Sequence, residues 1–349
     1  MKMEIKKLLR PHLLNLIPYS SARDEFKGAA EVYLDANENA FGSTSKDKYR
    51  RYPDPYQIAL KAKIGAIKGI STENIFLGNG SDEPIDLLIR AFCNPGLDKI
   101  IITPPTYGMY EVSANINDVG IVKVPLHADF TLDLSKVMEA IEPGIKIIFL
   151  CSPNNPTGNS IDKNDILEIV KKFQGLVILD EAYIDFSTND SLIHELELYP
   201  NLVILQTFSK AWGLAALRLG MTFANAKIIE VLNMIKPPYN INGATQDLVL
   251  KALENTGEMK HMVDNILAQK KRLKSMLSGI STVKEIYPSD ANFILVKIDN
   301  AHETYLELIE KKVIVRDRSG VELCADCLRI TVGTEKENTK LIEQLKKIS

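Results

Sequence analysis

One lysine, Lys210, stands where its amine could become reactive. It follows an apolar run at residues 202–205 and a serine, Ser209, and Arg218 comes soon after it. A lysine forms a Schiff base only when its amine is neutral, so burial or nearby positive charge must lower its pKa. Residues 214–217 are apolar and Arg218 could supply the charge. Lys210 is therefore predicted to hold an aldehyde cofactor, although a lysine exposed in a strand-to-helix turn would look similar.

Five polar clusters, including the one with Lys210, each come soon after an apolar run. They lie at residues 78–81, 104–107, 154–158, 180–183 and 209–210. Apolar runs that alternate with helical stretches indicate parallel strands joined by crossover helices. Because ligands of an open parallel sheet lie beyond the carboxyl ends of its strands, these clusters are expected to meet at one edge.

The pattern also predicts the elements that position these clusters. Strands are expected at residues 75–77, 100–102, 147–151, 177–179 and 202–205, and helices at 61–68, 84–92, 134–141 and 164–173. After residue 251, a long charged helix to 277, strands at 293–298, 313–315 and 328–332, and a final amphipathic helix indicate a smaller unit. The predicted fold is α/β, with a mostly parallel central sheet sandwiched by helices and a second, smaller α/β domain.

Composition narrows the class of protein. The chain has 349 residues, a net charge of -3 and a pI near 6.0, so no bulk attraction for nucleic acid is expected. No apolar run reaches the length of a membrane span and no signal-peptide core is present, so a cytoplasmic protein without a membrane partner is predicted. Cys324 and Cys327 form a C-x-x-C without a second ligand pair, which favours packing residues over a metal site.

The string SKAWGLAALRLG, which contains Lys210, resembles the lysine motif of fold type I aminotransferases that depend on pyridoxal 5'-phosphate (PLP). The similarity extends from about Pro18 to Gly333, and it is closest to the branch that acts on histidinol phosphate. It implies reversible amino transfer between histidinol phosphate and 2-oxoglutarate, which gives glutamate, within histidine biosynthesis. It also implies a homodimer, an N-terminal arm (1–28) that packs with the small domain, a large PLP-binding domain (29–245) and a small domain (246–349).

Three residues are predicted to be catalytic, namely Lys210, Asp180 and Tyr183. Asp180 follows an apolar run, and a buried carboxylate there would keep the cofactor ring nitrogen protonated. It could instead be an aspartate in a turn at the end of a strand. The resemblance assigns Asn155 and Tyr183 to the cofactor phenolic oxygen and places Asn37 and Asn155 against the substrate, although residues 154–158 alone are also a good turn sequence.

The cofactor phosphate needs backbone N–H groups, hydroxyls and a cation. Ser81 can cap a helix that Pro84 would help to start, which gives an N-terminus that attracts an anion. The predicted phosphate set, in which Asp82 acts through its backbone, is Ser81, Asp82, Ser209 and Arg218. Asp82 could also be an ordinary acid of a first helical turn.

Two tyrosines complete the predicted cofactor site. Tyr107 is expected to stack on the ring, which adds about 0.5–1.5 kcal/mol beyond burial, although a core tyrosine is the alternative. Tyr52 resembles the tyrosine that this family contributes to the cofactor phosphate of the neighbouring subunit. The sequence does not exclude that Tyr52 is a surface residue.

The substrate residues depend on Arg329, which lies in an apolar, strand-like context. An unpaired guanidinium is costly there, so Arg329 is expected to meet an anion. In aminotransferases the matching arginine binds the substrate α-carboxylate, where histidinol phosphate carries a phosphomonoester instead. The resemblance supplies Arg316 and Tyr19 as further phosphate donors, although Arg316 could form a surface ion pair with Asp317 or another acid.

Other functions remain open at this point. Relatives with nearly the same residues decarboxylate amino acid phosphates, and an aromatic amino acid aminotransferase would use the same cofactor site. A third, non-enzymatic alternative is a PLP sensor, which would normally be fused to a DNA-reading module. No room for such a module is expected in this chain.

Overall fold

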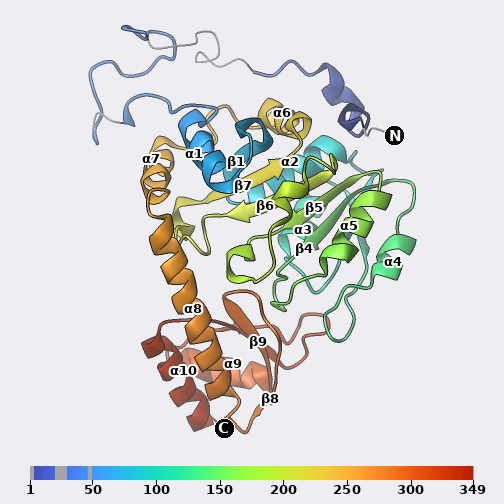
Figure 1. The fold of residues 1–349 in the computed structure, drawn as a ribbon, viewed down its shortest axis with the longest axis vertical. Helices are drawn as coiled ribbons and strands as arrows, with labels where there is room; N and C mark the ends of the chain where they lie inside the picture. Colours follow the sequence, from blue (N-terminus) through green and yellow to red (C-terminus); the bar gives the residue numbers. More distant parts are fainter. Residues whose placement is uncertain (1–3, 20–29, 46–48, 349) are drawn as a thin grey trace.

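A seven-stranded sheet lies at the centre of the large part of the fold, in the order β1-β7-β6-β5-β4-β2-β3. The structure is a computed structural model that describes residues 4–19, 30–45 and 49–348 (Figure 1). The strands are β1 (Ile75–Asn79), β2 (Lys99–Ile102), β3 (Gly120–Lys123), β4 (Ile145–Cys151), β5 (Leu176–Asp180), β6 (Leu202–Thr207) and β7 (Leu219–Ala224). Only β7 runs antiparallel to its neighbours, β1 and β6. The carboxyl ends of β1, β2, β4, β5 and β6 therefore share one edge.

Helices cover both faces of this sheet. They are α1 (Ile58–Lys68), α2 (Asp82–Phe92), α3 (Met109–Ile116), α4 (Leu134–Glu139), α5 (Lys163–Lys172), α6 (Ala226–Ile235) and α7 (Gly243–Ala252). Alternate residues of β4 enter opposite cores, since Ile148 packs with the cluster of α1, α4 and α5, whereas Phe149 packs with that of α2, α3 and α6. Burial on both faces explains why the strands are almost continuously apolar.

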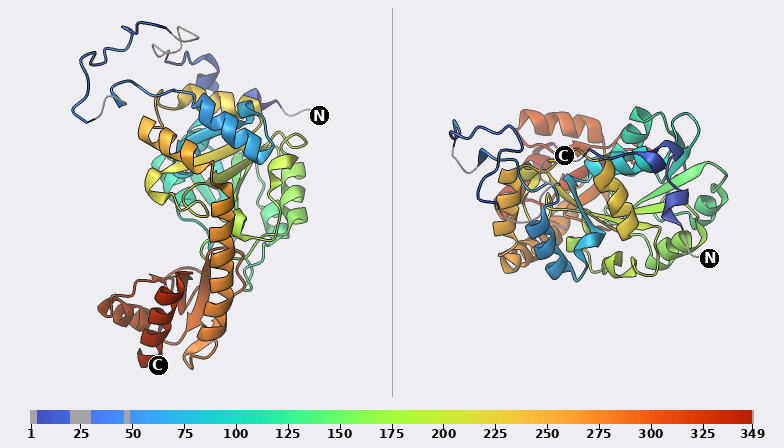
Figure 2. Two further views of the ribbon diagram at one scale, coloured as in Figure 1. Left: turned by 60° about the vertical axis from the view of Figure 1, so that its left-hand side comes forward. Right: turned by 90° about the horizontal axis from the view of Figure 1, so that it is seen from above.

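A four-stranded antiparallel sheet forms the small part, in the order β10-β11-β9-β8. Its strands are β8 (Val283–Ile286), β9 (Phe293–Ile298), β10 (Arg316–Asp317) and β11 (Cys327–Thr331), and its helices are α8 (Thr256–Leu277), α9 (Ala301–Glu310) and α10 (Glu335–Ile348). Figure 2 shows that α8 extends from the large part into the small part. Because α8 spans both, the domain division at residues 245 and 246 stays a prediction.

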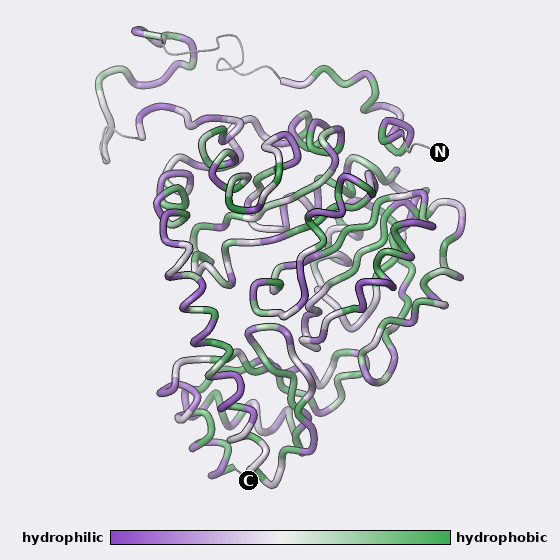
Figure 3. The backbone as a smooth tube through the Cα atoms, viewed as in Figure 1, coloured by the Kyte–Doolittle hydropathy of each residue, from purple (hydrophilic) through white to green (hydrophobic). Residues whose placement is uncertain are grey.

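Hydrophobic residues concentrate along the central strands, as the hydropathy colouring of the backbone shows (Figure 3). Cys324 and Cys327 belong to a buried hydrophobic cluster, as expected for packing residues. Within the described residues, no helix combines the length and apolar character that a membrane crossing requires.

The predicted fold class is confirmed, but two of the finer predictions differ from the structure. Residues 313–315 are not a strand, because Val313 N still donates to the carbonyl of Leu308 at the end of α9, so β10 begins only at Arg316. The described part of the arm also departs from the prediction. Ile5 is buried in the core cluster of α2 and α3, and Arg10 N donates to Ala91 O, so residues 5–15 pack on the large part and not on the small one.

Gly220 in β7 allows a close backbone approach beside residues that are predicted to bind phosphate. A Cβ at this position would lie 2.4 Å from the carbonyl carbon and oxygen of Gly80 and 2.8 Å from Ser81 N. A hydrogen bond of 2.9 Å from Gly80 N to Arg218 O holds the two backbone segments together. The absence of a side chain at Gly220 therefore lets the backbone of Gly80 and Ser81 lie against β7, where Gly80 bonds Arg218.

We predict that Gly220→Ala destabilises the protein, because its methyl group would displace backbone atoms and not a flexible side chain. Overpacking of this kind costs about 1–3 kcal/mol. The free energy of unfolding from urea titration measures it. Gly257→Ala is the matched control, since nothing lies within 4 Å of a Cβ there. Equal unfolding free energies for the wild type and Gly220→Ala would contradict this account of β7.

Candidate active site

A cavity of about 710 Å³ lies at the carboxyl edge of the large sheet, and residues of β10 and β11 close it from the small part. Each of the five polar clusters contributes to its lining, as predicted from their positions after the strands. The predicted site residues that line it are Ser81, Asp82, Tyr107, Asn155, Asp180, Tyr183, Ser209, Lys210, Arg218, Arg316 and Arg329. Residues far apart in the sequence thus meet in one pocket.

Lys210 lies partly buried in this cavity, with its Nζ 5.3 Å from the centre of the Tyr183 ring. Burial lowers the pKa of its amine, the positive charge of Arg329 lowers it further, and Arg218 contributes less. Asp180 opposes these effects. The expected contribution of Arg218 is confirmed, but burial and Arg329 are the larger causes, and Ala215 in the apolar stretch 214–217 is exposed.

Asp180 ends β5 and is 3% exposed. Its Oδ2 accepts a hydrogen bond of 2.7 Å from the hydroxyl of Tyr110, and its Oδ1 accepts one of 3.0 Å from Ala182 N. Burial raises the pKa of this carboxyl, which the two hydrogen bonds and the charge of Lys210 oppose. A cation at the pocket side would therefore stabilise the carboxylate.

Tyr110 was not predicted, although the sequence PPTYGMY places it three residues after Tyr107. It is fully buried on α3, stacked on Phe149 at 4.6 Å between ring centres, with Tyr107 edge-on at 5.6 Å. Packing from two aromatic rings fixes the hydroxyl that bonds Asp180. The available signal was a second tyrosine close to Tyr107 in sequence, since Tyr107 lies just before α3 and its ring contacts that of Tyr110 edge-on.

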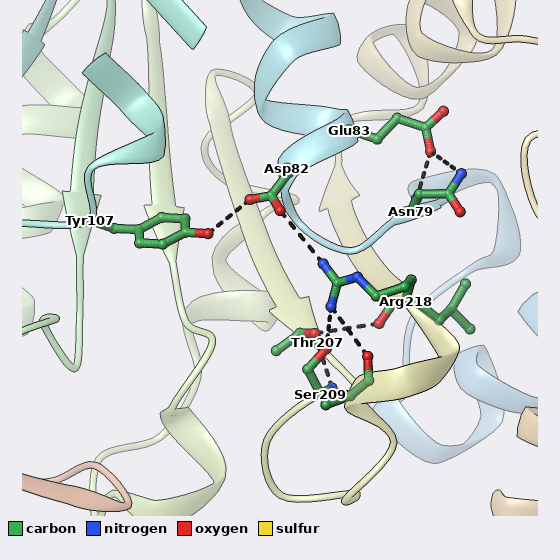
Figure 4. Close-up of polar contacts among 9 residues, drawn as sticks. Asn79, Asp82, Glu83, Tyr107, Thr207, Ser209 and Arg218 are labelled. Carbon is green, nitrogen blue, oxygen red and sulfur yellow. Dashed lines mark hydrogen bonds and ion pairs between the residues drawn. The ribbon is translucent and has the colours of Figure 1, made fainter. Parts of the chain in front are cut away.

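Asp82, Ser209 and Arg218, which are predicted to bind the cofactor phosphate, lie close together where α2 begins and where the loop after β6 meets β7 (Figure 4). Arg218 Nη2 lies 3.6 Å from Asp82 Oδ2, and Arg218 Nη1 donates to Ser209 Oγ at 3.4 Å. Tyr107 donates to Asp82 Oδ1 at 2.9 Å, so Asp82 uses its carboxylate here and not only its backbone. The hydroxyl of Ser81, at the N-cap of α2, is buried without a partner among the described residues.

Arg316 and Arg329 lie directly opposite each other in the antiparallel pair β10 and β11. Arg329 Nη1 donates to Asn155 Oδ1, its guanidinium carbon lies 5.3 Å from the centre of the Phe293 ring, and its buried Nε has no partner among the described residues. The suggested ion pair between Arg316 and Asp317 is not formed. Asp317 instead pairs with His302, at 2.8 Å.

Three predicted residues lie outside this cavity. Tyr52 is 52% exposed and stacks on Tyr239, with ring centres 4.5 Å apart, while Tyr19 is 76% exposed and Asn37 is exposed as well. The cavity lining also includes residues that the sequence analysis did not predict as site residues, among them Thr106, Met109, Val112, Cys151, Thr207, Arg318 and Val321. Most of these carry no distinctive motif.

The chemistry of the donors fits PLP. The amine of Lys210 can react with the aldehyde of PLP, and the buried carboxylate of Asp180 can pair with a protonated ring nitrogen. The hydroxyl of Ser81, which has no partner among the described residues, and the guanidinium of Arg218 can bind the phosphate of PLP. Fold and site together define a PLP-dependent aminotransferase of fold type I. The family model of aminotransferase class I and II matches residues 19–345, so the chain belongs to that family, whose cofactor is PLP.

Individual relatives are similar over most or nearly all of their length. The histidinol-phosphate aminotransferase of Cytophaga hutchinsonii is 53% identical, over 99% of both chains. The crystal structure of the Clostridium acetobutylicum histidinol-phosphate aminotransferase superposes with a TM-score of 0.80 at 26% identity, covering 86% of this chain and 91% of that chain. The Sinorhizobium meliloti histidinol-phosphate aminotransferase in complex with PLP shares the fold, with a TM-score of 0.81 at 22% identity over 97% of both chains.

Proposed function

We propose that this protein is a histidinol-phosphate aminotransferase. It would transfer an amino group reversibly between L-histidinol phosphate and 2-oxoglutarate, which gives imidazole acetol phosphate and L-glutamate in histidine biosynthesis. The relative from Cytophaga hutchinsonii, 53% identical over 99% of this chain, supports the proposal. The structural observation that carries it is the pair of Arg316 and Arg329, which lie opposite each other at the cavity wall without an acidic partner among the described residues.

Lys210 is proposed to hold the cofactor and then to move the reacting proton. PLP supplies an electron-withdrawing ring that takes up charge when the substrate C–H bond breaks. When Lys210 is not bound to the cofactor, the Nζ of Lys210 would accept the proton from the substrate carbon and later return a proton to the product. The lowered pKa of Lys210 serves this role, because a neutral amine is the base.

The remaining cofactor residues are proposed to orient and hold it. Asp180, fixed by Tyr110, would keep the ring nitrogen protonated, and Tyr107 would lie against the ring. Asn155 and Tyr183 would donate to the phenolic oxygen, as in the family that the chain resembles. The phosphate would be bound by Ser81, Asp82, Ser209 and Arg218.

The substrate anion is proposed to bind at the arginines. Arg329, oriented by Asn155, would bind the carboxylate of glutamate or the phosphate of histidinol phosphate. A single bidentate arginine suits a carboxylate, whereas a phosphomonoester has room for the additional donor Arg316. Tyr19 and Asn37, exposed in this chain, are proposed to contribute to substrate binding.

We also propose a cytoplasmic homodimer in which Tyr52 reaches the cofactor phosphate of the neighbouring subunit. Tyr52 is 52% exposed and lies outside the cavity of its own chain, which leaves it accessible to a second copy. Its stack on Tyr239 would hold it in place. The four free cysteines, all buried, are compatible with a reducing compartment.

Lys210→Ala is expected to lower turnover by at least about 100-fold, because positioned acid-base groups typically contribute factors of 100 to 10,000. Borohydride reduction should attach the cofactor to the wild type and not to this variant, as mass spectrometry would show. Lys163→Ala is the control, since that exposed amine only pairs with Glu195. Comparable turnover in Lys210→Ala, or a cofactor adduct on another lysine, would exclude the proposed role.

Mixed dimers test the position of Tyr52. A Lys210→Ala chain combined with a Tyr52→Phe chain should form heterodimers in which one of the two active sites carries neither substitution. Activity of the mixture above that of either parent is expected. Heterodimers demonstrated by mass, but without gain in activity, would place Tyr52 outside the partner's site.

Arg316→Ala should slow the reaction with histidinol phosphate by about 10- to 100-fold and leave that with glutamate within about threefold, since a hydrogen bond to a charged group contributes about 1.5–3 kcal/mol. Arg329→Ala should slow both. The single-turnover rate of cofactor conversion with each amino donor measures this. Arg272→Ala, which breaks only an exposed pair with Glu335, is the control. Equal losses for Arg316→Ala with both donors would favour the aromatic aminotransferase instead.

A further inference from the structure

Arg318 brings a third guanidinium to the cavity wall that holds Arg316 and Arg329. The pairing of β10 with β11 continues past Asp317, because Arg318 N donates to Cys327 O at 2.9 Å. Side chains alternate along a strand, and residues directly opposite share a face. The register of Arg316 with Arg329 therefore places all three arginines on the face toward the cavity.

The only carboxylate of β10 lies on the other face and is already bound. Asp317 Oδ2 lies 2.8 Å from His302 Nδ1, and Asp317 Oδ1 accepts a hydrogen bond of 2.8 Å from Ser319 N. Asp317 is thus paired with His302 and forms no ion pair with any of the three arginines.

None of the three arginines forms an ion pair with a carboxylate in the part of the chain that the structure describes. The arginine ion pairs found there involve Arg51, Arg90, Arg218 and Arg272. Arg329 donates to a neutral amide, that of Asn155, and Arg318 Nη1 lies 3.5 Å from the backbone carbonyl of Asp317. Like charges placed opposite each other destabilise a sheet, so this face is suited to bind an anion.

The turn after β10 holds Arg318 before any ligand binds. Its N–H is bonded to Cys327, its carbonyl accepts from Val321 N at 2.8 Å, and the next N–H, that of Ser319, is bonded to Asp317. A guanidinium on a fixed backbone loses less freedom when it binds, which increases its contribution to affinity.

We propose that Arg318 is a specificity-determining residue that donates to the phosphate of a phosphomonoester substrate, together with Arg316 and Arg329. This inference rests on the proposed function and deepens it. A carboxylate offers two oxygens and one charge, which one forked guanidinium satisfies. A phosphomonoester offers three terminal oxygens and nearly two charges at neutral pH, so it can engage three guanidinium groups. Arg318 would thus favour the phosphorylated amine over a carboxylate substrate.

The test compares histidinol phosphate with histidinol, which is the same amine without phosphate. Arg318→Ala should lower kcat/KM for histidinol phosphate by about 10- to 100-fold, the equivalent of one hydrogen bond to a charged group. The values for histidinol and for glutamate should stay within about threefold of the wild type. Arg318→Lys, which keeps the charge but loses the fork, should fall between. Arg272→Ala is the control on the exposed surface.

The outcomes separate this inference from the proposed function. A wild type that strongly prefers histidinol phosphate, combined with an Arg318→Ala variant that keeps the same preference, would overturn the role of Arg318 alone. Equal losses with all three amines would also overturn it, since they indicate a structural role. A wild type that converts histidinol phosphate and histidinol equally well would overturn the proposed function and this inference together.

Discussion

The positive charge of arginines that form no ion pair among the described residues is the constraint on which the cavity depends. Arg316 and Arg329 lie opposite each other in a short sheet where like charges are unfavourable, and burial makes the charge of Arg329 still more costly. The same charge lowers the pKa of Lys210. An anion at Arg329 would offset that effect, so binding of the substrate anion and the basicity of the cofactor amine are electrostatically linked.

The same cavity also contains a buried carboxyl group, that of Asp180. Asp180 is buried at the end of β5, where its pKa is raised, and the hydroxyl of Tyr110 and the N–H of Ala182 hold its two oxygens. A cation facing Asp180 would complete this arrangement. The cavity thus presents arginines to the substrate and a carboxylate to the cofactor ring. The pKa of Lys210 is lowered by Arg329 and raised by Asp180.

Much of this site could be predicted from sequence because parallel strands carry their carboxyl ends to one edge. The clusters around Ser81, Asp180 and Lys210 each follow an apolar run, so their meeting required only the strand direction. Arg318 and Tyr110 were missed for a physical reason. Their roles depend on strand register and helix packing, which are set by contacts between segments far apart in the sequence.

The same limit explains the errors. The apolar residues 313–315 resemble a strand, but the end of α9 holds Val313 by a hydrogen bond, and pairing starts at Arg316. Arg218 lowers the pKa of Lys210 as predicted, but Arg329 from the small sheet, which the sequence did not suggest as a cause, has the larger effect. Local sequence predicts the elements, and the contacts between the two sheets decide which charges meet.

The most direct measurement of the central claim is the product balance with a purified, PLP-loaded protein. Histidinol phosphate is supplied with 2-oxoglutarate, and the glutamate and CO2 that form are measured. Separate reactions replace histidinol phosphate with an aromatic amino acid or with threonine phosphate. The account predicts one glutamate for each histidinol phosphate consumed, no CO2 from any substrate, and a clear preference for the phosphorylated amine over the aromatic amino acid. Release of CO2 from threonine phosphate, or an equal rate with the aromatic amino acid, would contradict it.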